Sequence, residues 1–181
     1  MSDIVIDADI MRSAGISEHP HSSNARKVLD TIWSAGHNMV QCAPLKQEYD
    51  KHQGRYAATW RAKMISKKRW RYWDYQEDST LRNSLVKALP DAISSKEKEV
   101  IKDAHLLEAA VATDHRIVSK DATARNLFRH SCSVLGMHKS ILWGDVTGSP
   151  DDVIQWIIDG CADRNDFKLC PKVMKKAAKK Q

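Results

Sequence analysis

Four acidic residues of this 181-residue chain are spaced so that they could share one site. They follow or precede short apolar runs, and they are Asp7, Glu48, Asp103 and Asp121. Carboxylates that gather without basic partners repel one another, so such a group is stable only when divalent cations neutralise it. Hard oxygen ligands favour Mg²⁺ or Mn²⁺ over Zn²⁺. One or two such ions could activate water and stabilise the leaving oxygen during phosphodiester hydrolysis.

Each of these acids also has an ordinary structural explanation. Asp7 and Asp121 could be helix N-caps, because each follows a predicted strand and precedes polar or helical sequence. Glu48 and Asp103 could be exposed residues of predicted helices. Taken one at a time, the ordinary explanation is the better one, but the joint order of the four acids along the chain favours a metal site.

A second candidate functional region is the basic segment 55–75. Seven Lys and Arg residues stand in it against Asp74 as the only acid, together with six of the chain's twelve aromatic residues. Cations neutralise phosphates and aromatic rings stack on unpaired bases, so this composition is typical of a surface for single-stranded nucleic acid. The residues that we expect to contact RNA are Arg61, Lys67, Lys68, Arg69, Trp70, Arg71 and Trp73. The alternative is an amphipathic helix whose aromatic face packs inward.

The four acids can meet only if the chain forms a suitable sheet. Apolar β-branched runs predict strands at 4–6, 38–43, 116–119 and 139–143. Helical spacing and capping residues predict helices at 23–35, from Pro44, at 55–73, 80–88, 94–112 and 122–130, and from Pro150. Strands that alternate with helices predict a three-layer α/β/α fold with a mainly parallel central sheet. Ligands of such sheets bind at the carboxyl ends of the strands, where the acids could converge.

Composition limits the classes of protein to consider. The net charge of +6 favours a polyanionic partner, and 42% hydrophobic residues suit a globular domain. No apolar run has the length of a membrane span, and the first residues lack the basic stretch of a signal peptide, so we expect a cytoplasmic protein without a membrane partner. The four cysteines form no C-x-x-C pair, which predicts reduced thiols. We expect one domain over residues 1–160 and a flexible basic tail over 161–181.

Three segments resemble the PIN-domain nucleases, including the VapC-like ribonuclease toxins, in order and spacing. They are IVIDADIM at 4–11, PLKQEY at 44–49 and KDAHLLEAAVATDHRIVSKD at 102–121. The resemblance implies a PIN fold in which the four acids hold one or two Mg²⁺ or Mn²⁺ ions for RNA cleavage. It also implies that Asp9 and Ser119 are supporting groups near the site. For partners, it suggests an inhibitory protein such as an antitoxin, and a homodimer.

The resemblance leaves alternatives open. Only Glu48 matches in the second segment, so Asp50 or Glu77 could take its place, and the chain past His130 is longer than in the small toxins. A catalytically inactive PIN-like module that binds RNA or a protein is one alternative function. VIDADI also resembles the D-x-D motif of haloacid-dehalogenase-like phosphatases, with Asp7 as nucleophile and Asp9 as general acid. That assignment gives no role to the other three acids.

Overall fold

The fold is built on a parallel five-stranded sheet. The structure is a computed structural model that describes residues 1–134, 136 and 140–171. Its strands pair only in parallel, in the order β3-β2-β1-β4-β5. They are β1 (Asp3–Ile6), β2 (Asn38–Gln41), β3 (Trp70–Tyr72), β4 (Arg116–Ser119) and β5 (Leu142–Asp145). The strand order reverses between β1 and β4, so the chain has a topological switch point there.

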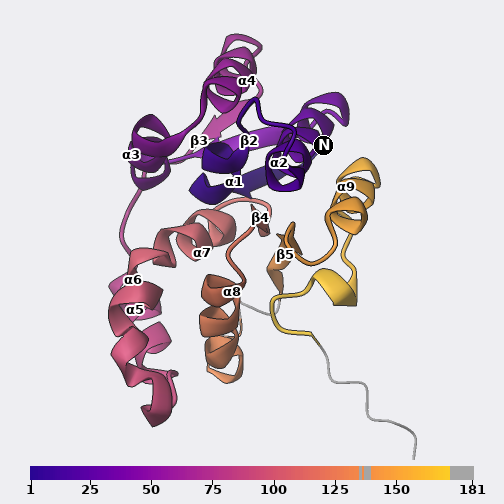
Figure 1. The fold of residues 1–181 in the computed structure, drawn as a ribbon. Helices are drawn as coiled ribbons and strands as arrows, with labels where there is room; N and C mark the ends of the chain where they lie inside the picture. The colour runs from indigo at the N-terminus through magenta and orange to yellow at the C-terminus, as the bar shows by residue number, and fades with distance from the viewer. Residues whose placement is uncertain (135, 137–139, 172–181) are drawn as a thin grey trace, which may run out of the picture.

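Helices cover both faces of this sheet, which confirms the predicted three-layer α/β/α architecture. In the described residues they are α1 (Ala8–Ser13), α2 (Pro20–Ser34), α3 (Ala43–His52), α4 (Arg55–Ser66), α5 (Ser79–Lys87), α6 (Glu97–Lys102), α7 (Ala104–Val111), α8 (Ala122–Arg129) and α9 (Pro150–Ile158). Helices α2, α4 and α9 lie on one side of the sheet, and α7 and α8 lie on the other (Figure 1). None of the described helices is long and apolar enough to cross a membrane.

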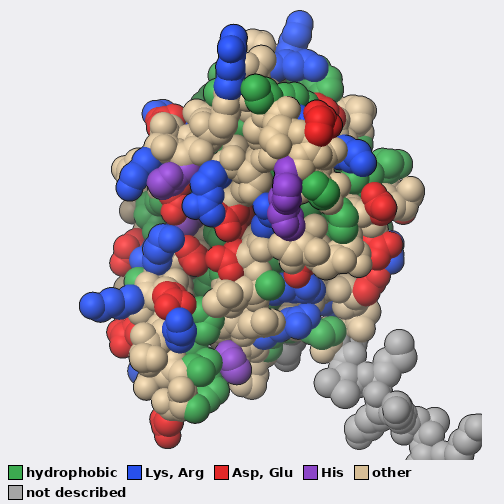
Figure 2. Space-filling view, in the orientation of Figure 1, with side chains coloured by type: hydrophobic (Ala, Val, Ile, Leu, Met, Phe, Trp, Pro, Cys, Tyr) green, Lys and Arg blue, Asp and Glu red, His purple; other side chains and the backbone are tan. Residues whose placement is uncertain are grey.

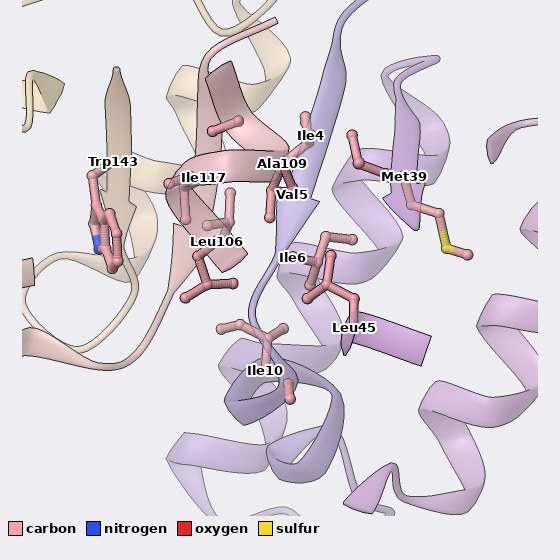
Figure 3. Packing of buried hydrophobic residues seen from close by; sticks show 14 of the residues in the cluster. Ile4, Val5, Ile6, Ile10, Met39, Leu45, Leu106, Ala109, Ile117 and Trp143 are labelled. Carbon is pink, nitrogen blue, oxygen red and sulfur yellow. The ribbon is translucent and has the colours of Figure 1, made fainter. Parts of the chain in front are cut away.

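The central strands are apolar along their length because both faces of the sheet are covered. Ile4, Val5 and Ile6 of β1 are fully buried, and so are Ile117 and Val118 of β4. Figure 3 shows several of these side chains packed against residues from neighbouring helices. Burial on both faces is the reason why β1 reads as a continuous β-branched run instead of an alternating one. The core therefore fixes the two strands that carry Asp7 and Asp121 at their ends.

The helix predicted over 55–73 is wrong in its second half. Helix α4 ends at Ser66, and Lys68 takes a left-handed conformation with φ of 54°. The chain then enters β3, which pairs with β2 at the edge of the sheet. Aromatic residues favour strands, and here the segment also pairs with β2 at the edge of the sheet. That pairing depends on the rest of the fold, so the helical spacing of the residues could not indicate it.

The long helix predicted over 94–112 is also divided. Its first part is a 3-10 turn at Asp91–Lys96, where the Ser94 hydroxyl donates to Asp91 O and does not form the expected capping box. Helices α6 and α7 then meet at Asp103, whose backbone lies outside the helical region at φ −94° and ψ 0°. The break places Asp103 at the start of α7. Two further differences are α1, which was not predicted, and β5, which begins later than expected.

Residues 161–171 pack against the rest of the domain. Phe167 and Leu169 are buried, and Lys168 forms a β-bridge with Leu142. A disulfide joins Cys132 to Cys170, which corrects the expectation of reduced thiols for this pair, whereas Cys42 and Cys161 are free and buried. Part of the expected tail is thus tied to the domain, and residues 172–181, which hold five of its six lysines, lie outside the described residues.

Candidate functional site

The four acids singled out from the sequence line one pocket at the carboxyl edge of the sheet. The pocket has a volume of about 110 Å³ and is lined by Asp7, Ala8, Asp9, Arg12, Glu48, His52, Lys102, Asp103 and Asp121. Figure 2 shows acidic side chains near the middle of one face, with Lys, Arg and His side chains around them. Since Asp7 directly follows β1 and Asp121 lies just beyond β4, the pocket lies at the topological switch point.

Asp7 is the most deeply placed of the four. Its side chain accepts hydrogen bonds from Ser119 Oγ at 2.6 Å and from the backbone N–H of Asp9 at 3.2 Å. The second bond makes Asp7 the N-cap of α1. The residue is 8% exposed, and this burial raises the pKa of the carboxyl to about 6 although both hydrogen bonds lower it. Asp7 therefore carries a charge that its protein partners do not fully compensate.

Asp121 is anchored in a similar way. Its Oδ1 accepts from the N–H of Ala124 at 2.8 Å and caps α8, while its own N–H donates to Ser119 Oγ at 2.8 Å. Both N-cap explanations are therefore correct, and both caps nevertheless line the pocket. Ser119 contacts both acids and holds the ends of β1 and β4 together, so it has the supporting position expected for it.

Asp103 lies at the break between α6 and α7. Burial raises its pKa to about 6; the neighbouring Lys102 and His105 oppose this rise, and Asp121 and Glu48 add to it. The Lys102 ammonium is 3.9 Å from Asp103 Oδ1, too far for a hydrogen bond. Asp103 thus contributes a second incompletely compensated carboxylate to the same pocket.

Glu48 has a protein partner. Its Oε2 lies 3.5 Å from Nε2 of His105, whose Nδ1 is 3.0 Å from Lys102 O. Burial favours the neutral acid, but His105, Lys102 and His52 outweigh it, so the pKa of Glu48 is lowered. The 3.5 Å contact is too long for a good hydrogen bond, so His105 acts on Glu48 mainly through its charge when it is protonated.

The two competitors for the Glu48 position lie elsewhere. Asp50 pairs with Lys46 at 2.5 Å and with Arg61 at 2.7 Å. Glu77 pairs with Arg82 at 3.3 Å and lines a different pocket. Neither lines the acidic pocket, so the geometry favours Glu48.

Sequence reasoning missed the basic side chains beside these acids. Arg12 binds Asp9 at 2.6 Å one helical turn away, and Lys102 and His52 line the same pocket. Asp9 thus contributes to the pocket wall while its carboxylate is partly neutralised. The signal was present in the spacing of Asp9 and Arg12 along one helix face and in the place of Lys102 next to Asp103.

The carboxylate oxygens of the pocket are ligands that a hard divalent cation prefers, although they are not yet close enough together to coordinate one ion. Within the described residues, no three Asp, Glu, His or Cys side chains are grouped closely enough to hold an ion as they stand. The pocket is nevertheless dominated by carboxylate oxygens, and two of these carboxylates have a raised pKa because their charge is poorly compensated. A cation bound among Asp7, Asp103 and Asp121, with Glu48 at the side, would remove that cost.

Most of the basic segment lies at the opposite edge of the sheet. Arg69 donates to Trp33 O at 2.6 Å and also to His37 O, and Arg71 pairs with Asp3 at 3.0 Å. Asp3 begins β1 and His37 directly precedes β2, so both arginines lie at the amino edge. The exposed Lys67 and Lys68 join the end of α4 to the start of β3 at this same edge.

The other members of the expected RNA surface are partly or fully buried. Arg61 is 7% exposed and donates to Gln41 Oε1 at 2.9 Å as well as to Asp50. Trp70 and Trp73 are half-buried against the core. The structure therefore does not bring this set together with the acids.

Comparison with known proteins adds no assignment, because no protein-family model, no curated protein and no solved structure matches this chain.

Proposed function

We propose that this protein is a metal-dependent endoribonuclease that hydrolyses phosphodiester bonds of RNA with a PIN-like carboxylate site. The observation that carries the proposal is the meeting of Asp7, Glu48, Asp103 and Asp121, from four separate segments, around one pocket at the switch point. Structural acids scattered over a surface have no reason to converge there. The pKa values of about 6 for Asp7 and Asp103 are a further sign of a functional site.

The four acids would divide the work of holding Mg²⁺ or Mn²⁺. Asp7, Asp103 and Asp121 would bind one ion, and Glu48 would complete its coordination or position a second. When bound, the metal would supply an activated water and stabilise the leaving oxygen. Ser119 keeps the Asp7 carboxylate and the Asp121 backbone in place, and His105 lies beside Glu48. Removal of such supporting groups commonly weakens a metal site.

The substrate backbone would be held by the cations next to the pocket. Arg12, His52 and Lys102 line the pocket and could contact a phosphate there. Positive side chains beside the acids suit an RNA substrate, because they would attract its phosphates while the carboxylates hold the metal ion. The cations of the basic segment at the amino edge are not part of this contact. A cytoplasmic location also belongs to the proposal. An antitoxin-like inhibitor and a homodimer belong to it as well, and these two rest on the resemblance alone.

The proposal is tested by incubating labelled single-stranded RNA and DNA of matched sequence with the protein in Mg²⁺, Mn²⁺ or EDTA. We expect RNA cleavage that requires metal and is lost in Asp7→Asn and Asp103→Asn. Asp91→Asn, an exposed acid outside the pocket, should cleave like the wild type. RNA binding without cleavage in either metal would support the inactive binding module instead. Turnover of a phosphomonoester without RNA cleavage would support the phosphatase.

A further inference from the structure

A second pocket lies at the end of α8, and the disulfide forms part of its wall. Its volume is about 450 Å³, and the residues that line it include Arg129, Cys132, Ser133, Lys168 and Cys170. In Figure 1 the last described part of the chain, in yellow, runs beside α8, and the disulfide joins the two. Small-molecule sites commonly have volumes of roughly 300–1,000 Å³, so this pocket can hold a small ligand next to the disulfide.

The disulfide is the part of the cysteine chemistry that a molecule in solution can reach. Cys132 and Cys170 are both half-buried, and both line the pocket. Cys42 and Cys161 are free but fully buried, and this burial raises the pKa of their thiols to about 11 and about 12. Such thiols are inert, because only the thiolate is a nucleophile. A reagent that exchanges with sulfur would therefore react at the disulfide.

The charges around the disulfide favour an anion. Arg129 and Lys168 line the pocket, and none of the described residues that line it is acidic. Arg129 is half-buried, and its Nε donates to Leu169 O at 3.1 Å, but its guanidinium forms no ion pair with a carboxylate of the described residues. Lys168 pairs at 3.1 Å with Asp163, an exposed acid outside the pocket. Because charges that leave water are normally paired, Arg129 indicates a ligand with a negative group.

We propose that this pocket binds a small thiol that carries a carboxylate, and that the bound thiol exchanges with the Cys132–Cys170 disulfide. The carboxylate would pair with the Arg129 guanidinium, whose planar N–H donors suit two carboxylate oxygens. This contact holds the ligand beside the disulfide, so the thiolate does not have to find it by random collision. Arginine and a disulfide on one pocket wall together define the ligand class, since the first selects the charge and the second selects the sulfur.

The exchange is balanced without an oxidant. The ligand thiolate attacks one sulfur of the disulfide, the bond between Cys132 and Cys170 breaks, and a new disulfide forms between the ligand and the attacked cysteine. The other cysteine leaves as a thiolate and takes a proton from solvent. Lys168 and Arg129 stabilise this leaving thiolate, because cations near a cysteine lower its thiol pKa. One disulfide replaces another, so no electrons are lost or gained overall.

This site is separate from the acidic pocket. Asp121 caps the start of α8, whereas Arg129 is the last residue of this helix. The helix has eight residues, so the two pockets are about 12 Å apart along its axis. The inference therefore goes beyond the proposed nuclease function and does not rest on it.

The test compares a negative thiol, mercaptopropionate, with a neutral thiol, mercaptoethanol, on the full oxidised chain. Samples are quenched with a thiol reagent at several times, and intact mass and peptide mapping report the adducts. We expect a mixed disulfide at Cys132 or Cys170. Each rate constant is expressed per thiolate, and the ratio of the negative to the neutral thiol should fall about fivefold in Arg129→Gln, near the effect of one close charge pair in water.

Three further variants separate charge from packing. Arg129→Lys keeps the charge and should keep the wild-type ratio, and so should Lys27→Gln, which removes an exposed cation of α2 outside the pocket. Lys168→Gln should lower the ratio and repeats the test outside α8, in case Arg129→Gln loosens the end of that helix. Equal ratios in the wild type, Arg129→Gln and Lys168→Gln would overturn the proposal, and so would adducts that form only at Cys42 or Cys161.

Discussion

At the scale of single residues, Ser119 is the group on which the acidic site depends most. It donates to Asp7 and accepts from the N–H of Asp121, so one hydroxyl fixes an acid at the end of β1 and another beyond β4. We expect Ser119→Ala to weaken Mn²⁺ binding and RNA cleavage by about 10- to 100-fold, as loss of supporting groups does elsewhere. Calorimetric titration with Mn²⁺ measures the first effect. Ser84→Ala, which removes a hydroxyl from α5 outside the pocket, is the matched control, and an equal loss there would contradict this role.

The raised pKa of Asp7 predicts how its charge affects stability in EDTA. The folded-state pKa of about 6 exceeds the unfolded value of 3.8, so the folded protein binds the proton more tightly. The free energy of unfolding should therefore fall as pH rises from about 4 to about 6, by up to about 3 kcal/mol for this group. Asparagine does not ionise, so the Asp7→Asn variant should not show this fall. Its free energy of unfolding relative to the wild type should therefore be higher at pH 7 than at pH 4.5. Urea denaturation at both pH values measures the gain, and a constant difference would refute it.

Residue types alone could suggest the acids but not their neighbours. Asp7, Glu48, Asp103 and Asp121 were identified from their order along the chain, and the structure places all four around one pocket. Arg12 and Lys102 did carry a signal in their spacing from Asp9 and Asp103. His52 and His105 carry none until their neighbours in space are known. Arg61 is the reverse case, since its charge suggested phosphate binding but its guanidinium pairs internally with Gln41 and Asp50.

At the scale of the elements, His37 joins three segments at the amino edge of the sheet. Its Nδ1 accepts from the N–H of Ser2 at 3.0 Å, and its Nε2 lies 2.8 Å from Ile157 O at the end of α9. The first bond requires an unprotonated Nδ1, so the second is made by Nε2–H of the neutral ring.

Burial lowers the pKa of His37, which predicts acid sensitivity at this joint. The unfolded state gains the proton first, so the contribution of His37 to stability is present above a pH of about 6.5 and is lost as pH falls below it. His37→Gln should lose less stability than the wild type between pH 7.5 and pH 5.5. Thermal unfolding followed by circular dichroism checks this, and parallel losses in the two proteins would contradict it.

The Cys132–Cys170 disulfide ties the segment after α9 to the end of α8. Disulfides typically stabilise small domains by about 2–4 kcal/mol, so reduction with dithiothreitol should lower the free energy of unfolding by about that amount. The double variant Cys132→Ser/Cys170→Ser should start lower and show no further response to the reductant. If dithiothreitol leaves the free energy of unfolding of the wild type unchanged, although a thiol reagent shows that the disulfide is fully reduced, a stabilising role would be contradicted.

Elements were predicted well where one signal dominated. The apolar run of β1 and the Pro150 start of α9 matched the structure because burial and the fixed φ of a proline in the first turn act locally. Ser149 stands at the expected N-cap position, but its side chain makes no capping hydrogen bond. The segment 55–73 was mispredicted because its aromatic residues suit a helix face as well as a strand, and only pairing with β2 decides between them. The break at Asp103 likewise depends on how α6 and α7 pack, which helical spacing does not show.

At the scale of the whole molecule, positive charge is divided between the two edges of the sheet. Arg12 and Lys102 lie at the acidic pocket, whereas Lys67 and Lys68 lie at the amino edge. If RNA binds at the pocket, Lys102→Gln should reduce the slope of log affinity against log salt by about one unit. Lys67→Gln should leave the slope unchanged. Fluorescence anisotropy at several salt concentrations measures both, and the opposite result would move the RNA to the other edge.

The central claim is that the four acids form a divalent-cation site, and titration of the metal-free protein with Mn²⁺ tests it most directly. Calorimetry at pH 6 should show binding, with proton release because Asp7 and Asp103 have pKa values near 6. Asp103→Asn should weaken binding by at least about tenfold, and Asp91→Asn should bind like the wild type. Absence of Mn²⁺ binding to the wild type, or equal binding by all three proteins, would contradict the claim.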